Sequence, residues 1–127
     1  MVGVVIPARN EEDHLPKVLA TIPDFVDKVV VVDDGSTDNT GNLVGDAELV
    51  RLEGLGVGAA IDSGHQHLLS IFDSEFISVV MAGDGQMDPE DMESILKPII
   101  KKQAHHVKGE RIDRVGKMPI YRRFGTF

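Results

Sequence analysis

Two runs of apolar, mostly β-branched residues constrain the fold of this chain more than any other feature. Residues 2–6 (Val-Gly-Val-Val-Ile) and 28–32 (Lys-Val-Val-Val-Val) are almost continuously apolar, and weaker runs occupy 48–52 and 76–81. A strand that is apolar on both faces is typical of a parallel sheet covered by helices. Segments with the helical spacing of apolar residues lie between these runs, so the sequence predicts a strand–helix repeat and a mostly parallel α/β fold.

The remaining elements follow from helix caps, proline and apolar spacing. Asn10 is a candidate N-cap, with Glu11, Glu12 and Asp13 in the first turn of a helix that ends at Pro23. We expect a short helix over 38–44, a longer one from about 59 to 72, and one that begins at Pro89 and carries apolar residues to position 99. A strand over 107–112 is expected, and the rest of the chain shows no clear period.

Size and cysteine content indicate one intracellular domain. The 127 residues fit a single domain spanning 1–127, and the absence of cysteine excludes disulfides and thiolate metal sites. No signal peptide precedes the first strand, and no apolar stretch approaches the ~20 residues of a membrane helix. We therefore expect a cytoplasmic protein, and association with a membrane surface stays open.

Charge is distributed unevenly along the chain. The net charge of −8 argues against general nucleic-acid binding. Residues 1–100 carry five basic and nineteen acidic side chains, whereas 101–127 carry eight basic and two acidic ones. The basic segment from about 101 is either a solvated, irregular tail or a site for an anionic group.

Polar side chains follow three of the predicted strands. Pro7 to Glu11 follow the first strand, Asp33 and Asp34 end the second, and Asp84 and Gln86 follow the fourth. Because the carboxyl ends of parallel strands share one edge of a sheet, where open α/β sheets bind ligands, these groups should converge. Oxygen ligands without Cys or His suit Mg²⁺ or Mn²⁺, which is commonly shared with substrate phosphates.

Several of these residues also have purely structural explanations. Asp88 before Pro89 is a good helix start, and we weigh a capping role above a ligand role for it. Gly35, Ser36 and Thr37 are typical turn residues, although a turn does not explain two adjacent acids at the end of a buried strand.

A glycine-rich segment follows the third strand. Gly54, Gly56 and Ala59 fit the spacing of the dinucleotide-binding fingerprint, but they do not follow the first strand of their unit. A dinucleotide-dependent oxidoreductase therefore rests on these glycines alone, and a tight loop near a ligand or a neighbouring strand is preferred. His65 and His67 lie two residues apart, which favours surface positions over a metal pair.

Five stretches in order resemble the family 2 glycosyltransferases of the GT-A fold, and within them the dolichyl-phosphate mannose and glucose synthases. The stretches are Val4–Glu12 (VVIPARNEE), Val31–Asp38 (VVDDGSTD), Gly56–Ala60 (GVGAA), Asp84–Glu90 (DGQMDPE) and Val107–Arg111 (VKGER). Ala82 stands where the family often has the first acid of an Asp-x-Asp motif.

The resemblance implies a role for each matching position. The nucleotide pocket would include Pro7, Ala8, Arg9, Glu11, Asp33, Asp34 and Gly58, with Asp34 at the base. Asp84 and Gln86 would hold Mg²⁺ or Mn²⁺ on the donor diphosphate, and Asp84 and Asp88 are candidates for a catalytic role. Arg111 would face the phosphate of acceptor or donor, and Arg122 and Arg123 are further candidates for that region.

The resemblance implies transfer of a sugar from a nucleoside diphosphate sugar to an acceptor, with a polyprenyl or dolichyl phosphate at a membrane surface as one candidate. The chain stops soon after Arg123, whereas relatives continue into acceptor-binding elements. The alternative is therefore a non-catalytic nucleotide-sugar-binding or regulatory module. Such a module could form a homo-oligomer, with its basic tail against a second subunit.

Overall fold

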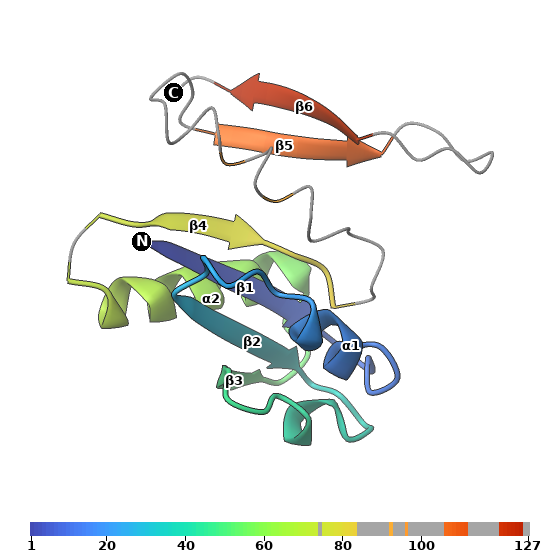
Figure 1. The fold of residues 1–127 in the computed structure, drawn as a ribbon. Coiled ribbons are helices and arrows are strands. Elements are labelled where there is room, and N and C mark those ends of the chain that lie inside the picture. Colours follow the sequence, from blue (N-terminus) through green and yellow to red (C-terminus); the bar gives the residue numbers. More distant parts are fainter. Residues whose placement is uncertain (74, 84–91, 93–95, 97–105, 112–119, 126–127) are drawn as a thin grey trace. The chain divides into compact units, whose positions relative to one another are not determined.

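The computed structural model describes residues 1–73, 75–83, 92, 96, 106–111 and 120–125 (Figure 1). The chain forms two units, residues 1–87 and 88–127. The first contains β1 (Val2–Ala8), α1 (Leu15–Ala20), β2 (Lys28–Asp34), the 3₁₀ helix η1 (Thr40–Asn42), β3 (Glu48–Leu52), α2 (Val57–Ile71) and β4 (Ile77–Val80). The second contains β5 (His106–Arg111) and β6 (Ile120–Gly125).

The four strands of the first unit form a parallel sheet in the order β3-β2-β1-β4. This confirms the predicted parallel α/β fold and the four predicted strands. The chain moves outward from β1 to β3 and then returns to β4, so right-handed crossovers put α1 and α2 on opposite faces of the sheet (Figure 1).

Both faces of the two central strands are buried. Val5, Val30 and Val32 pack with Ala60 and Leu68 of α2 in one apolar cluster. Successive side chains of a strand point to opposite faces, so the intervening buried residues Val4, Ile6 and Val31 lie on the side of α1. Burial on both faces is the physical reason for the continuous apolar runs.

A glycine permits the close approach of α2 to β1. A methyl group on Gly64 would stand 2.3 Å from the Val5 Cγ1 atom, well inside van der Waals contact. We expect Gly64→Ala to lower the free energy of unfolding by about 1–3 kcal/mol, because a packed interface must open to admit the methyl group. Urea denaturation followed by circular dichroism measures the change.

Gly58 in the first turn of α2 is the matched control, because a methyl group there would meet no atom within 4 Å. Gly58→Ala should be neutral or stabilise the protein by up to about 1 kcal/mol through helix propensity. Equal destabilisation by the two substitutions would contradict the close packing of Gly64 on Val5.

Two elements differ from the sequence predictions. The first helix begins at Leu15 instead of after Asn10, because Asn10 has a left-handed backbone (φ 55°) and its neighbours bond to another loop. The predicted helix over 38–44 is only the 3₁₀ turn η1, since the Asp38 side chain takes up the Thr40 N–H. The predicted helix from Pro89 lies largely outside the described residues.

The second unit contains an antiparallel pair in which β5 and β6 align Lys108 with Arg123 and Gly109 with Arg122. The strand expected over 107–112 is confirmed in position. The expectation of irregular structure after it was wrong for 120–125, where Ile, Tyr and Phe favour a strand once a partner strand is available. Among the described residues, no helix has both the length and the apolar character needed to cross a membrane.

Candidate functional site

The carboxyl ends of β1, β2 and β4 meet at one edge of the sheet, as predicted. Ala8 at the end of β1 pairs in register with Asp33 of β2. On its other side, a methyl group on Gly83 would lie 3.3 Å from the Ala8 Cβ atom. The segment Pro7–Ala8 therefore lies between the acids of β2 and the residue that immediately precedes Asp84.

The other predicted site residues belong to later elements of the chain. Gly58 lies in the first turn of α2, two residues after Gly56, whose N–H bonds to Asp34. Arg111, Arg122 and Arg123 belong to β5 and β6 of the second unit. Asp84, Gln86 and Asp88 lie outside the described residues, so their assignments stay predictions.

Asp34 holds the loop between β3 and α2. Its Oδ1 atom accepts hydrogen bonds from the N–H groups of Gly54 (3.0 Å) and Leu55 (2.7 Å), and Oδ2 accepts one from Gly56 (2.8 Å). These bonds, that from Leu55 above all, lower the pKa of Asp34 although its burial acts in the opposite direction. A carboxylate has about four acceptor positions, so most of its capacity is used within the protein.

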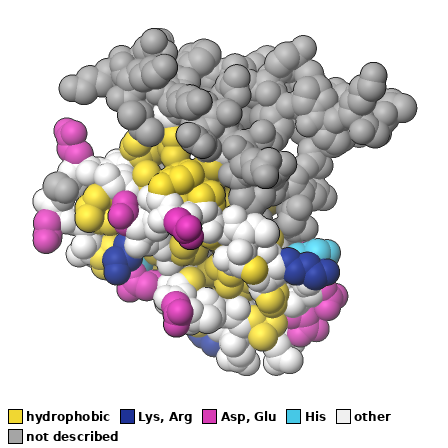
Figure 2. All heavy atoms as spheres, in the orientation of Figure 1, with side chains coloured by type: hydrophobic (Ala, Val, Ile, Leu, Met, Phe, Trp, Pro, Cys, Tyr) yellow, Lys and Arg dark blue, Asp and Glu magenta, His cyan; other side chains and the backbone are white. Residues whose placement is uncertain are grey.

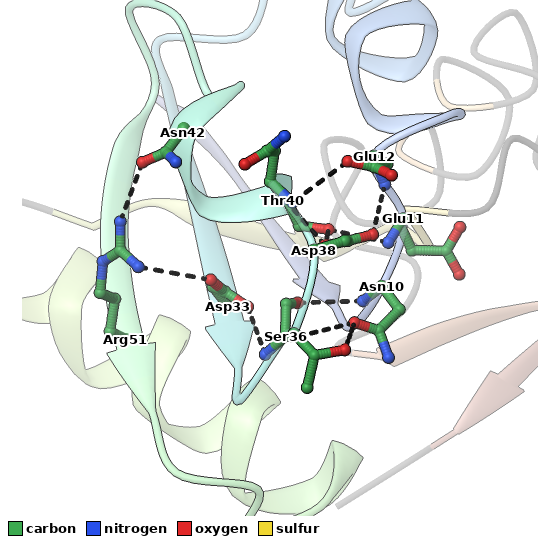
Figure 3. A network of polar contacts seen from close by, with 11 residues as sticks. Asn10, Glu11, Glu12, Asp33, Ser36, Asp38, Thr40, Asn42 and Arg51 are labelled. Carbon is green, nitrogen blue, oxygen red and sulfur yellow. Dashed lines mark hydrogen bonds and ion pairs between the residues drawn. The ribbon is translucent and has the colours of Figure 1, made fainter.

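Asp33 points to the opposite face of the sheet, because neighbouring side chains in a strand alternate. Its Oδ1 atom accepts a hydrogen bond from Ser36 N–H (3.1 Å), and its Oδ2 atom lies 3.8 Å from Arg51 Nη1 (Figure 3). Gly41 leaves room for this pair, since a methyl group there would stand 2.5 Å from Asp33 Oδ2. The two adjacent acids thus organise two different loops, one on each face of the sheet.

A set of hydrogen bonds joins the loop after β1 to the loop after β2, and we call it the inter-loop network (Figure 3). Three consecutive backbone N–H groups donate to side chains of the second loop: Asn10 to Ser36 Oγ (2.9 Å), Glu11 to Thr40 Oγ1 (2.9 Å) and Glu12 to Asp38 Oδ2 (3.3 Å). Two bonds run the other way, from Thr37 N–H to Asn10 Oδ1 (2.8 Å) and from Asn39 N–H to Glu12 Oε2 (3.1 Å).

Sequence reasoning missed the inter-loop network. It interpreted Asn10 as a helix cap and Thr37 as a turn or cap residue, because the local pattern fits both roles. The partners are separated by 26 to 29 residues, and only the parallel pairing of β1 with β2 brings them together. The one available signal was the density of Asn, Asp, Ser and Thr in two loops predicted to share an edge.

Stability at acid pH should depend on two carboxylates of this edge. The pKa of Asp38 is lowered mainly by hydrogen bonds from Thr40. The pKa of Asp34 is lowered mainly by hydrogen bonds from the backbone of residues 54–56. A carboxyl group whose pKa is lower in the folded than in the unfolded protein stabilises the fold at pH values above the usual pKa of 3.8. This stabilisation is lost as the pH falls through the pKa of the folded state.

We therefore expect the free energy of unfolding to fall from about pH 5 to about pH 3, and to fall less in an Asp34→Asn, Asp38→Asn double variant. Urea titrations across this range measure both slopes, with Asp24→Asn, Asp46→Asn as the matched control for net charge. An unchanged slope in the first double variant would contradict the assigned role of the two carboxylates.

The described residues of this edge do not form a complete set of metal ligands. They contain no group of three or more His, Asp or Glu side chains arranged to hold one, and most of the acceptor capacity of Asp34 is already used. A hard cation at this edge would need additional oxygen donors. Asp84 and Gln86, which the family resemblance implies as metal ligands, follow Gly83 in the sequence, and Gly83 packs beside Ala8.

The carboxyl end of β2 and the loops that follow β1 and β2 contain more acidic than basic side chains. There the basic residue Arg9 is accompanied by Glu11, Glu12, Asp13, Asp33, Asp34 and Asp38. Figure 2 shows acidic side chains dispersed over the visible face of the described region, with few Lys or Arg side chains among them. A cavity of about 580 Å³ lies away from the site, where α1 and residues 43–48 flank the amino ends of β2 and β3.

The chain belongs to glycosyl transferase family 2, whose family model matches residues 3–126. It is 26% identical, over 99% of its length, to a UDP-N-acetylglucosamine–dolichyl-phosphate N-acetylglucosaminyltransferase of Methanococcus voltae, of which it covers 59%. It is 32% identical to a polyprenol monophosphomannose synthase of Mycolicibacterium smegmatis, with 76% of this chain and 40% of that protein covered.

Solved structures confirm the GT-A fold that the resemblance implied. Glucosyl-3-phosphoglycerate synthase of Mycobacterium tuberculosis in complex with UDP matches with a TM-score of 0.64 at 25% identity, over 84% of this chain and 42% of that one. The same enzyme with Mn²⁺, UDP and glucosyl-3-phosphoglycerate matches with a TM-score of 0.59 at 26% identity, over 78% and 39%. The chain spans between 53% and 59% of the length of three curated relatives it matches.

Proposed function

We propose that this chain is the donor-binding part of a glycosyltransferase that uses a nucleoside diphosphate sugar and a divalent cation. The observation that carries the proposal is the match to glycosyl transferase family 2 over residues 3–126, combined with polar loops gathered at the carboxyl edge of the sheet. That edge is where open α/β sheets bind ligands.

The nucleotide is proposed to contact Pro7, Ala8, Arg9 and Glu11, with Asp33 and Gly58 nearby. The Asp34 carboxylate keeps about one free acceptor position, so contact with the base stays a prediction beside its structural role in the 54–56 loop. The inter-loop network supports the proposal, because it fixes the backbone of the segment that would meet the nucleotide.

Electrostatics gives an independent reason to propose a metal. Carboxylates at the carboxyl edge would repel a diphosphate, and departure of a nucleoside diphosphate from the sugar increases negative charge on the leaving group. Mg²⁺ or Mn²⁺ held by Asp84 and Gln86 would neutralise that charge. Relatives support this, since the similar synthase of M. tuberculosis was crystallised with Mn²⁺ or Mg²⁺ and UDP. Asp88 is proposed as an additional catalytic candidate.

The proposed acceptor is a polyprenyl or dolichyl phosphate at a membrane surface. The name of one relative contains dolichyl phosphate, and the name of another contains polyprenol monophosphomannose. A phosphate oxygen is already ionised at neutral pH and needs no general base, so the site would have to position it rather than activate it. The basic segment that includes Arg111, Arg122 and Arg123 is proposed to face this anionic group.

A transfer assay tests the catalytic half of the proposal. Radiolabelled nucleoside diphosphate sugars with uracil or guanine bases are incubated with polyprenyl phosphate and Mn²⁺, and the organic phase is counted. Metal-dependent label in the lipid supports a transferase. Binding of the donor without transfer or hydrolysis would instead favour a nucleotide-sugar-binding module.

A further inference from the structure

We propose that Thr40, oriented by Asp38, is a positioning residue for donor binding: it fixes the backbone at Glu11 and so the segment Arg9–Glu11 that would meet the nucleotide. The inference rests on the proposed function. It assigns a role to two residues that lie outside the predicted nucleotide pocket.

The direction of the Thr40 hydroxyl is set by its two partners. Its oxygen accepts a hydrogen bond from Glu11 N–H at 2.9 Å. The hydroxyl hydrogen must then be donated elsewhere, and the Asp38 Oδ1 atom is its acceptor. An ionised carboxylate only accepts hydrogen bonds, so Asp38 fixes the hydroxyl with its lone pair toward Glu11.

Water cannot replace this hydroxyl easily, because Thr40 has 0% of its surface exposed. Asp38 also accepts hydrogen bonds from Thr40 N–H (2.9 Å) and Glu12 N–H (3.3 Å). The Asp38 carboxylate thus binds the Thr40 hydroxyl, which holds Glu11 N–H, and also binds the N–H of the following residue, Glu12.

The backbone at Glu11 controls two neighbouring features. On its amino side, Asn10 adopts the left-handed conformation (φ 55°), which asparagine visits more readily than other non-glycine residues, and its N–H and side chain bond to Ser36 and Thr37. On its carboxyl side, the Glu11 carbonyl accepts hydrogen bonds from His14 N–H (3.1 Å) and Leu15 N–H (2.8 Å), where α1 begins. Loss of the Thr40 bond would therefore let the segment relax between two constrained ends.

Such relaxation should reduce ligand affinity more than global stability. A loop that is already held in its binding conformation loses little conformational entropy when a ligand arrives. A loop released by substitution loses that advantage, while the apolar cluster on the α2 side of the sheet stays intact.

Two substitutions at Thr40 separate the hydroxyl from the shape of the side chain. Thr40→Val keeps the shape and removes the hydroxyl, whereas Thr40→Ser keeps the hydroxyl and removes a methyl group. Ser78→Ala is the matched control, because Ser78 lies on β4 outside the inter-loop network. The substitution removes a hydroxyl that is hydrogen-bonded to His65 Nδ1 of α2 (2.5 Å). Calorimetric titration with UDP-sugar and Mn²⁺ gives the dissociation constant, and thermal unfolding gives the stability of each variant.

We expect Thr40→Val to raise the dissociation constant about tenfold, with Thr40→Ser and Ser78→Ala within about twofold of the parent protein. Amide hydrogen exchange at Glu11, followed by NMR without nucleotide, should accelerate in Thr40→Val alone. If Thr40→Val is too unstable to titrate, Asp38→Ala replaces it, and a similar weakening is expected because the Thr40 hydroxyl then loses the acceptor that directs its lone pair toward Glu11 N–H.

The outcomes separate this inference from the proposed function. Equal affinity in the parent, Thr40→Val and Asp38→Ala proteins would overturn the positioning role and leave donor binding standing. A parent protein that binds no nucleotide sugar would overturn both. Weakening in Thr40→Ser as large as in Thr40→Val would also overturn the inference, since shape and not the hydroxyl would then matter.

Discussion

Asp84→Asn is expected to abolish Mn²⁺-dependent nucleotide binding, with a loss of more than about 100-fold in affinity. The substitution keeps the size of the side chain and removes the negative charge that would hold the cation. Removal of a residue that only hydrogen-bonds to a metal ligand typically lowers metal affinity by about 10–100-fold. Removal of the charge of a direct ligand should lower the affinity further. Electron paramagnetic resonance of free Mn²⁺ measures metal binding directly, without any assay of turnover.

Asp91→Asn provides the control for this prediction. It makes the same chemical change seven residues further along the chain, at a position without an assigned role. Circular dichroism should show an unchanged fold in both variants, because the exchange of a carboxylate for an amide removes no apolar packing. Retention of full Mn²⁺ and nucleotide binding in Asp84→Asn would remove this residue from the metal site.

Replacement of Arg111, Arg122 and Arg123 by alanine is expected to abolish binding to anionic lipid vesicles. A basic side chain near an anionic membrane contributes about 1 kcal/mol, so three of them account for roughly 3 kcal/mol, or roughly a hundredfold in affinity. All three residues belong to β5 and β6, whose register aligns Arg123 with Lys108. Sedimentation with vesicles at low and high salt measures the association, which should weaken as salt screens the charges.

A triple variant of Lys17, Lys28 and Lys97 matches this change in net charge and lies outside the basic segment. It should bind vesicles as the parent protein does. If the parent protein does not bind vesicles and its dimeric fraction rises with protein concentration, the lipid prediction is contradicted. That result would favour contact between the basic segment and a second subunit.

The fold could be predicted from the sequence because burial on both faces leaves a direct pattern. The runs at 2–6 and 28–32 became the central strands β1 and β2, which extend to Ala8 and Asp34. Boundaries of helices were less predictable. Asn10 looks like a helix cap in isolation, but its N–H and side chain bond to Ser36 and Thr37, so α1 starts later.

The location of the candidate site could be predicted, but its internal bonding could not. Acidic residues at the ends of predicted strands indicated a site at the carboxyl edge, because a parallel sheet brings the carboxyl ends of its strands together. The partners of Asp34 lie 20 to 22 residues away, and those of Glu11 and Glu12 lie 26 to 29 residues away. Such bonds depend on the packing of whole loops, which no local pattern specifies.

Calorimetric titration of the unmodified chain with nucleoside diphosphate sugars, in Mn²⁺ and then in excess chelator, tests the central claim most directly. Donor binding at the carboxyl edge predicts saturable heat for at least one uracil or guanine nucleotide sugar in Mn²⁺. The heat should disappear with the chelator, because an acidic edge without its cation repels the diphosphate. No binding in Mn²⁺, or equal binding in chelator, would contradict a metal-dependent donor site.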